Sequence, residues 1–477
     1  MGSEHKGYWP TIIPLPIDRQ ERERLVTTLF SSKLGLRILS EIALEGRACQ
    51  RDIINALKEH SNRTVIEALR KLVELGLLKE YVVVRKSGMR RVRMKCYRLT
   101  ETGRWFSLLF RDPKDLDKHT LRLTLRGLLG DVVEKVMQHQ EHLGLSSDDV
   151  LRIFCEKIME TQIRSREKSE PKVFVLGSVA IDHYVRARRN LPGAVSYYEY
   201  IGVFPGGSGA NVAVSLSSLG VSTGFYGKIA TDMYGLQLLT SLIRSGVNVD
   251  SVELDENKST VETLVVLTSR GYSKILCMIN DNSALSPQHL NIDAWPPKSL
   301  KGLYVGEVFH EVASEAMKPL QNENTIVIYR PLALALDTMT QKYLSLLCYR
   351  PILVLNREKT ELLRKKGVEV PQTLFDKGAE HVIVTLDEEG AILFSRRTGE
   401  KLRYTPPRVK PRDTAGAGDV FAASLMHSLL EGHHIQDAVR KACLTATLST
   451  RIIGARQKAE SINEVSGDVS EVKITKL

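Results

Sequence analysis

The chain has 477 residues, of which 43% are hydrophobic and 26% are charged. An ordinary domain has about 100–200 residues, so this length predicts several domains, and the composition excludes wholesale disorder. No apolar run approaches the roughly 18 residues that a membrane-spanning helix needs. The first ten residues carry no apolar stretch behind their charges, which argues against a secretory signal.

Six cysteines stand at positions 49, 96, 155, 277, 348 and 443, and no two of them form a C-x-x-C pair. Zinc sites and disulfide frameworks show closer and more regular cysteine spacing. The sequence therefore predicts reduced thiols, with neither a disulfide framework nor a zinc site.

Positive charge is concentrated near the N-terminus. The net charge is +11, and residues 1–110 alone contain 21 basic and 12 acidic side chains. Within this part, Lys79–Arg98 contains eight basic side chains and a single acidic one, Glu80. A basic face on one small unit predicts a polyanionic partner for that unit.

Residues 1–18 contain three prolines and are expected to form an extended arm. Residues 19–110 show a pattern of three helices followed by a β-hairpin. The expected elements are a helix between residues 25 and 42, a helix at Gln50–Lys58, a helix capped by Ser61 and ended by Gly76, and the strands Tyr81–Val84 and Val92–Leu99.

This order of elements resembles a winged helix-turn-helix domain, as do the strings T-V-I-E-A-L-R-K-L-V-E-L-G-L-L and Y-R-L-T-E-T-G. The resemblance implies that the third helix enters the major groove of DNA and that the hairpin contacts phosphates. The residues expected to bind DNA are Ser61, Asn62, Arg63, Thr64, Arg70, Lys86, Arg90, Arg91 and Arg93. The alternative is a unit that mediates protein contacts, with its cations forming a solvated face.

Residues 111–170 carry two further helical patterns, Lys114–His142 and Ser147–Arg166. They are expected to form either a dimer seam or a rigid spacer, and the sequence does not separate these readings. A homodimer is attractive because paired DNA-reading heads require two-fold symmetry.

From residue 171 to 457, short apolar strands such as Val173–Leu176 and His381–Thr385 alternate with helical stretches. This alternation predicts an α/β domain with a mostly parallel sheet. Residues 458–477 are expected to form a C-terminal tail.

Two glycine-rich segments in this region suggest phosphate chemistry. They are P-G-G-S-G-A-N-V-A-V-S-L-S-S-L-G, from Pro205 to Gly220, and D-T-A-G-A-G-D-V-F-A-A-S-L, from Asp413 to Leu425. A glycine turn that opens a helix lets backbone N–H groups converge on an anion. Asp419, directly after the second turn, suits a general base for an attacking hydroxyl.

Together these segments resemble the PfkB (ribokinase-like) family of carbohydrate and nucleoside kinases. The segments V-L-G-S-V-A-I-D, L-N-R-E-K-T-E-L-L and V-T-L-D-E-E-G-A support the resemblance because they occur in the family's order. It implies a ribokinase-like fold with a small β lid from about Tyr184–Phe204 and Val261–Met278. The resemblance also implies that Asp419 is the general base and that the amides of Gly416, Ala417 and Gly418 form the anion hole. The residues implied to bind the phosphoryl acceptor are Asp182, Gly206, Gly207 and Asn211. The residues implied to bind the nucleotide are Asn356, Thr385, Asp387, Asp413 and Thr414.

Three departures from the family's pattern bear on ATP and Mg²⁺. Lys359 takes the acidic place of the N-x-x-E segment, Arg330 stands where many members have aspartate before proline, and Asp387 replaces a turn glycine. Glu358 or Glu361 is the candidate that would replace the missing acid at the metal. These departures weigh against ATP and Mg²⁺ binding, and variation within a working kinase is the alternative.

The sequence thus predicts a multidomain protein: a winged helix-turn-helix unit, a helical spacer and a ribokinase-like α/β domain. The expected function is a DNA-binding transcription regulator whose kinase-like domain binds a sugar, polyol or nucleoside. The alternative is an active ATP-dependent sugar or nucleoside kinase that carries a DNA-binding head. The expected partners are double-stranded DNA and the polyhydroxyl ligand, without a membrane, and the expected location is the cytoplasm, at the nucleoid.

Overall fold

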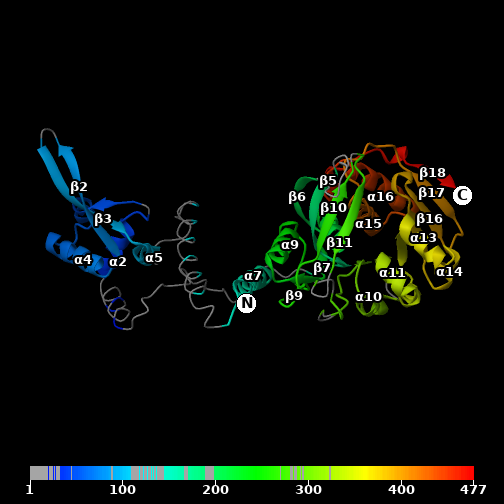
Figure 1. Cartoon of the computed structure of the whole chain (residues 1–477), viewed down its shortest axis with the longest axis horizontal. Coiled ribbons are helices and arrows are strands. Elements are labelled where there is room, and N and C mark those ends of the chain that lie inside the picture. Colours follow the sequence, from blue (N-terminus) through cyan, green and yellow to red (C-terminus); the bar gives the residue numbers. More distant parts are fainter. Residues whose placement is uncertain are drawn as a thin grey trace, which may run out of the picture. The chain divides into compact units, whose positions relative to one another are not determined.

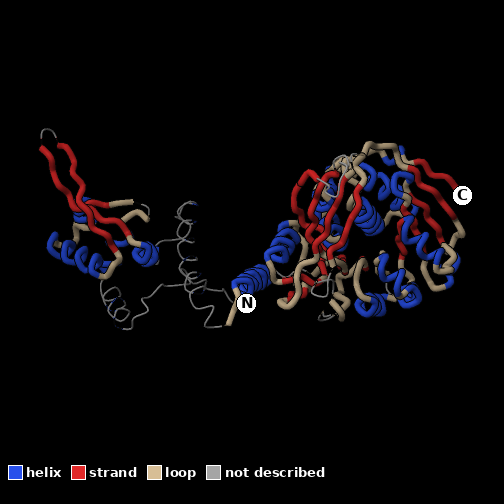
Figure 2. The backbone as a smooth tube through the Cα atoms, viewed as in Figure 1, coloured by secondary structure: helices blue, strands red, loops and turns tan. Residues whose placement is uncertain are grey.

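The computed structural model divides the chain into two units, Met1–Ser146 and Ser147–Leu477 (Figures 1 and 2). It describes residues 33–44, 46–87, 90–108, 144–165, 170–187, 198–268, 270–279, 295–321 and 324–477, and a few isolated residues between them. The predicted arm at 1–18 and most of the predicted helix Lys114–His142 lie outside the described residues. No helix in the described part of the chain is long and apolar enough to cross a bilayer.

The N-terminal unit contains helices that pack around a three-stranded sheet of order β1-β3-β2. Its elements are α2 (Lys33–Glu41), β1 (Ala48–Cys49), α3 (Gln50–Ala56), α4 (Asn62–Glu74), β2 (Leu78–Ser87), β3 (Arg90–Leu99) and α5 (Glu101–Leu108). Buried residues of α2, α4 and β3 meet in one core, to which α5 adds Trp105 and Phe106.

Local signals in α4 and the hairpin are confirmed. The Ser61 hydroxyl caps α4 by accepting a hydrogen bond from the Thr64 N–H at 3.2 Å. Gly76 follows the helix with φ 68°, a conformation in which a side chain is disfavoured. The antiparallel β2–β3 pairing extends the predicted hairpin to Leu78–Leu99 at one end and Ser87–Arg90 at the other.

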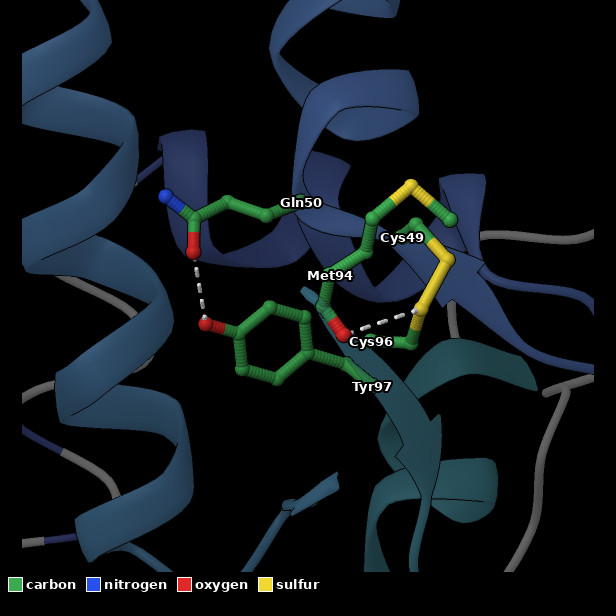
Figure 3. Close-up of a disulfide and its surroundings, with 5 residues drawn as sticks. All are labelled: Cys49, Gln50, Met94, Cys96 and Tyr97. Atoms are coloured by element: carbon green, nitrogen blue, oxygen red, sulfur yellow. Dashed lines mark hydrogen bonds between the residues drawn. A yellow bond between two sulfur atoms is a disulfide. The ribbon is translucent and has the colours of Figure 1, made fainter. Parts of the chain in front are cut away.

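The prediction of reduced thiols is wrong for two cysteines, because Cys49 and Cys96 form a disulfide (Figure 3). They lie 47 residues apart, but β1 pairs with β3 so that Cys49 stands directly opposite Cys96. Beside them, the Tyr97 hydroxyl donates to Gln50 Oε1 at 3.3 Å, which links β3 to the start of α3. The bond depends on a two-residue strand, which has no periodic signal in the sequence.

The C-terminal unit is built on a nine-stranded sheet of order β18-β17-β16-β15-β14-β13-β12-β4-β7. The strands that run parallel to one another are β7, β4, β12, β13, β14 and β15. Strands β16, β17 and β18 continue the sheet with antiparallel pairs. They are β4 (Val173–Leu176), β7 (Thr223–Tyr226), β12 (Gly302–Val305), β13 (Ile326–Tyr329), β14 (Ile352–Asn356), β15 (His381–Thr385), β16 (Ala391–Ser395), β17 (Lys401–Thr405) and β18 (Lys473–Lys476).

Helices cover both faces of this sheet because successive strand residues point to opposite sides. Val173 and Val175 face one core and Phe174 and Leu176 face the other. The first core receives α7 (Ser147–Arg164), α8 (Ser208–Ser218), α9 (Met233–Arg244), α15 (Ala417–Leu430), α16 (Ile435–Ser449) and α17 (Ala455–Glu460). The second receives α10 (His310–Met317), α11 (Ala333–Thr338), α12 (Thr340–Leu344), α13 (Arg357–Lys365) and α14 (Gln372–Asp376).

A second sheet of four strands has the order β11-β10-β5-β6. It consists of β5 (Ala180–Ala187), β6 (Tyr198–Gly206), β10 (Glu262–Leu267) and β11 (Ser273–Met278), the segments that the sequence assigned to a lid (Figure 1). A short parallel pair, β8 (Lys228–Ala230) with β9 (Glu253–Asp255), lies between β6 and β10 in the chain.

Two boundaries differ from the sequence prediction. Helix α7 was assigned to the spacer, but Met159 is fully buried in the core of the C-terminal unit and Arg152 donates to the Lys258 carbonyl at 2.8 Å. Residues 458–477 were expected to form a tail, whereas they complete α17 and supply β18 at the sheet edge. Strand β18 is short and exposed along its length, so it gives no periodic signal, and only sheet pairing reveals it.

Candidate active site

The predicted base Asp419 lies buried at the first turn of α15, at 6% exposure. Its Oδ1 accepts hydrogen bonds from the Ser208 hydroxyl at 2.8 Å and from Arg330 Nη1 at 2.6 Å, and its Oδ2 accepts one from the Asn211 amide at 3.1 Å. Ser208 and Asn211 both belong to α8, so the two glycine-rich segments meet at this carboxylate. The sequence analysis had not singled out Ser208.

Glycines at the start of α8 and α15 are required by close approach. A Cβ on Gly206 would collide with the Asp182 carboxylate, and one on Gly207 would collide with the Val179 backbone. Gly416 has φ 78°, and a Cβ there would stand 2.6 Å from Ala455 Cβ. These glycines let the acceptor residues and the anion turn lie within one site.

The predicted acceptor residue Asp182 lies on β5, where it is 7% exposed. Thr263 stands opposite it in the β5–β10 register and donates its hydroxyl to Asp182 Oδ1 at 2.6 Å. Burial raises the Asp182 pKa to about 6, against the opposing effects of the Thr263 hydrogen bond and of Arg456. Asp182 Oδ1 is thus engaged by Thr263, and burial favours the protonated form of this carboxyl group.

A buried arginine, Arg456, joins the acceptor residues to one another. Its Nε donates to Asn211 Oδ1 at 3.1 Å and its Nη2 donates to the Gly206 carbonyl at 3.2 Å. Arg456 is 1% exposed and fixes the orientation of the Asn211 amide. Arg456 was not predicted as a site residue, because it lies 245 residues from Asn211 and outside any motif.

The structure corrects the role of Asp413, which was predicted to contact nucleotide. Asp413 is fully buried, its Oδ2 lies 3.0 Å from the Lys458 ammonium, and its two carboxylate oxygens accept from the N–H groups of Ala415 and Gly454. Lys458 also donates to the Ala415 carbonyl at 2.6 Å. Asp413 and Lys458 therefore stabilise the conformation of the glycine turn through buried hydrogen bonds to its backbone.

The amides of this turn are not equivalent. Ala417 N–H donates to the Thr414 carbonyl at 3.3 Å, so one of the three predicted anion-hole donors is engaged. Among the described residues, the N–H groups of Gly416 and Gly418 donate no hydrogen bond. Two free donors therefore lie at the N-terminus of α15, where the helix dipole favours an anion.

The other predicted nucleotide residues lie at the carboxyl ends of neighbouring strands. Asn356 ends β14 and caps α13 by accepting from Lys359 N–H at 2.9 Å, while Thr385 ends β15 and donates to the Leu355 carbonyl at 3.3 Å. Asp387 has φ 52° and an exposed side chain. The Thr414 hydroxyl accepts from Ser273 N–H of lid strand β11 at 3.1 Å, which ties the lid to the turn.

The departures noted in the sequence surround the same site. Arg330 directly follows β13, and its Nη2 stands 2.6 Å from the position that a Cβ on Gly418 would take. Lys359 is 6% exposed, and burial followed by the nearby charge of Arg330 lowers its pKa to about 8. Glu307, which follows β12 and was missed in the sequence, accepts from the Ser178 hydroxyl at 2.5 Å.

The described residues offer no group of three or more side chains that could hold a metal ion. Glu358 and Glu361, the predicted candidates for Mg²⁺, are exposed on α13. The chemistry of the donor set, with Arg330 beside Asp419 and Lys359 buried nearby, fits an anion better than a cation. We therefore derive no step through a metal.

The sequence model of the pfkB family of carbohydrate kinases matches residues 170–462. The chain belongs to this family. Its C-terminal unit is 25% identical to 5-dehydro-2-deoxygluconokinase of Bacillus licheniformis over 320 residues, which cover 63% of this chain and 95% of that protein. It is 27% identical to ribokinase of Lactococcus lactis over 312 residues, 64% of this chain and 98% of that protein.

Solved structures agree in fold. A sugar kinase of Pyrococcus horikoshii matches with TM-score 0.50 and 24% identity, covering 63% of this chain and 98% of that one. A fructokinase of Xylella fastidiosa with bound ATP matches with TM-score 0.50 and 19% identity, covering 62% and 98%. The ribokinase-like α/β fold predicted for the C-terminal unit is thus confirmed, and the N-terminal unit lies before the residues that the family model matches.

Proposed function

We propose that the C-terminal unit is an ATP-dependent kinase that phosphorylates a hydroxyl of a sugar or nucleoside. The observation that carries the proposal is the position of Asp419, which α8 and α15 bury beside Asn211 and the turn Gly416–Gly418. Membership of the carbohydrate kinase family and the kinases among its relatives support the same reaction. This was the alternative reading of the sequence, and it now has more support than the regulator.

In this reaction the acceptor hydroxyl oxygen forms a bond to the terminal phosphorus of ATP, and the bond to the bridging oxygen of ADP breaks. The hydroxyl proton passes to Asp419, and ADP leaves. Asp182 and Asn211 orient the acceptor by its hydroxyls, while the N–H groups of Gly416 and Gly418 receive developing negative charge. Arg330 is paired with Asp419 Oδ1, which leaves Oδ2, held by the Asn211 amide, as the oxygen outside this ion pair.

The test is release of ADP from ATP with D-ribose, 2-deoxyribose, 5-dehydro-2-deoxygluconate, D-fructose and adenosine as acceptors. We expect Asp419→Asn to lower kcat on the accepted compound by about 10²–10⁴-fold, the usual contribution of a general base, with little change in acceptor affinity. Asp437→Asn, which removes an exposed carboxylate on α16, is the matched control and should retain activity. Equal activity of Asp419→Asn and wild type would refute the proposed role of Asp419.

A second candidate function is a ligand-responsive DNA-binding regulator, favoured by two observations. The ion pair between Arg330 and Asp419 occupies the base, which suits a site that binds ligand without rapid turnover. The N-terminal unit exposes the first turn of α4, where the Arg63 side chain is 90% exposed, next to a strongly basic hairpin. Acceptor binding without ADP release, together with a ligand-dependent change in DNA mobility shift, would favour this candidate over the kinase.

A further inference from the structure

Arg330 brings one positive charge to the carboxyl end of the central sheet. Its Nη1 donates to Asp419 and Ser208, and the buried Tyr304 hydroxyl lies beside the guanidinium, but Nη2 makes no close hydrogen bond to a described residue. This Nη2 lies next to Gly418, where a Cβ would approach it to 2.6 Å. The guanidinium therefore reaches from β13 to the turn that opens α15.

Lys359 brings a second positive charge to the same place from the first turn of α13. Lys359 is only 6% exposed, and its ammonium forms no hydrogen bond or ion pair with any described residue. Buried lysines are almost always paired, because an unpaired buried charge is costly. Arg330 follows β13 and Lys359 lies in the first turn after β14, and these two strands are parallel neighbours, so both side chains start from the same edge of the sheet. Burial and the charge of Arg330 lower the Lys359 pKa to about 8, while Glu307, Asp419 and Glu358 act in the opposite direction.

Two of the acidic groups near this pair, Asp419 and Glu307, already accept hydrogen bonds, and a third, Glu358, is exposed on α13. Asp419 is held by Arg330, Ser208 and Asn211, and Glu307 accepts from Ser178. Neither carboxylate lies within ion-pair distance of Lys359. Arg330 is thus paired with Asp419 through Nη1, whereas the Lys359 ammonium and the N–H groups of Gly416 and Gly418 make no hydrogen bond or ion pair with a described residue.

We propose that Arg330 and Lys359, with the N–H groups of Gly416 and Gly418, form a binding site for a phosphoryl group. The two side chains neutralise the negative charge of this group. The inference rests on the proposed function in that the group is either the terminal phosphate of ATP or the phosphate of a sugar product. It goes beyond that function by assigning recognition of the dianion to Arg330 and Lys359. Arg is suited to this role because its planar donors match a phosphate, and Lys supplies a point charge.

The test is binding of inorganic phosphate to the full chain by isothermal calorimetry, with EDTA present. We expect measurable phosphate binding by the wild type and a loss of about 10- to 100-fold in affinity for Lys359→Met, the range for a hydrogen bond to a charged group. Lys365→Met removes an exposed cation from the same helix and should bind phosphate as the wild type does. Lys359→Arg should retain most of the affinity.

Competition distinguishes the two sources of the phosphoryl group. Displacement of phosphate by a non-hydrolysable ATP analogue assigns the site to nucleotide, and displacement by ribose 5-phosphate assigns it to a sugar phosphate. Absence of displacement by both would overturn the proposal, as would equal phosphate affinity of wild type and Lys359→Met. Thermal unfolding of each variant shows whether the fold is retained, and if Lys359→Met fails to fold, the comparison of Lys359→Arg with Lys359→Gln replaces it.

This readout is independent of turnover. Phosphate binding that requires Lys359 in a protein that releases no ADP would support the phosphoryl site and refute the kinase. Turnover of ATP without phosphate binding would support the kinase and refute the phosphoryl site.

Discussion

Asp182 gives the acceptor site a pH dependence at the scale of a single residue. Burial raises its pKa to about 6, and the charged groups that face it are Arg456, Asp419 and Asp413, with the Thr263 hydroxyl donating to it. Only the ionised carboxylate accepts hydrogen bonds at both oxygens. A ligand that donates its hydroxyls to Asp182 therefore binds best above pH 6, where the proton has left.

We predict that affinity for the acceptor falls about 10-fold between pH 7 and pH 5, because the ionised fraction of a group with pKa near 6 falls by that factor. The measurement is calorimetric titration with whichever sugar or nucleoside the acceptor screen identifies. Asp182→Asn should bind more weakly and show no such slope. A wild-type affinity that is constant from pH 5 to 7 would mean that the ligand does not contact this carboxylate.

Residues within the glycine-rich segments were predictable, and the residues that support them were not. Asn211 and Asp419 each follow a local glycine motif, so the sequence alone identified them, and the structure brings them to 3.1 Å. Arg456 and Lys458 have no such local signal, because their partners Asn211 and Asp413 lie 245 and 45 residues away. The pairing of Arg330 with Asp419 also depends on tertiary structure, although Arg330 itself was noted as a departure.

At the scale of elements, local chemistry decided which predictions succeeded. Helix α4 has an N-cap, an apolar stripe and a terminal glycine, and its predicted bounds agree with the structure. Strand β1 has two residues and β18 has four exposed ones, so neither shows a buried face in the sequence. Their existence depends on pairing with β3 and β17, which is tertiary information.

Helix α7 permits a prediction at this scale. Met159 is fully buried against the core of the C-terminal unit, whereas its neighbour Ile158 is 45% exposed. We predict that Met159→Ala lowers the free energy of unfolding of that unit by about 2–5 kcal/mol, the usual cost of truncating a core side chain. Ile158→Ala should change it by about 0.5 kcal/mol or less. Urea denaturation followed by circular dichroism measures both.

Equal effects of the two variants would mean that α7 is not part of this core and would return it to the readings left open by the sequence, a dimer seam or a rigid spacer. Three further contacts argue otherwise. Cys155 lies 3.6 Å from the Met233 sulfur, Gln162 hydrogen-bonds Thr240 on α9, and Arg152 donates to the Lys258 carbonyl. The helix that precedes the family domain is therefore part of its fold.

At the scale of the whole molecule, charge divides between the two units. Residues 1–110 carry a net charge of +9 out of +11, so the family domain and the rest of the chain are close to neutral. A kinase that binds only small anions does not need this separate basic unit. We therefore propose that the basic unit has a partner of its own, and that this partner is DNA.

The prediction that tests this partner concerns the hairpin arginines Arg90, Arg91 and Arg93. If they contact phosphates, replacing all three with glutamine weakens DNA binding on every sequence, because phosphate contacts carry no base information. The slope of log affinity against log salt should fall by about one unit for each lost contact. Arg396→Gln with Arg397→Gln, which removes two exposed cations of the C-terminal unit, should leave the slope unchanged. Fluorescence anisotropy with labelled duplexes at several salt concentrations measures both, and an unchanged slope in the hairpin variant would exclude phosphate contacts by these arginines.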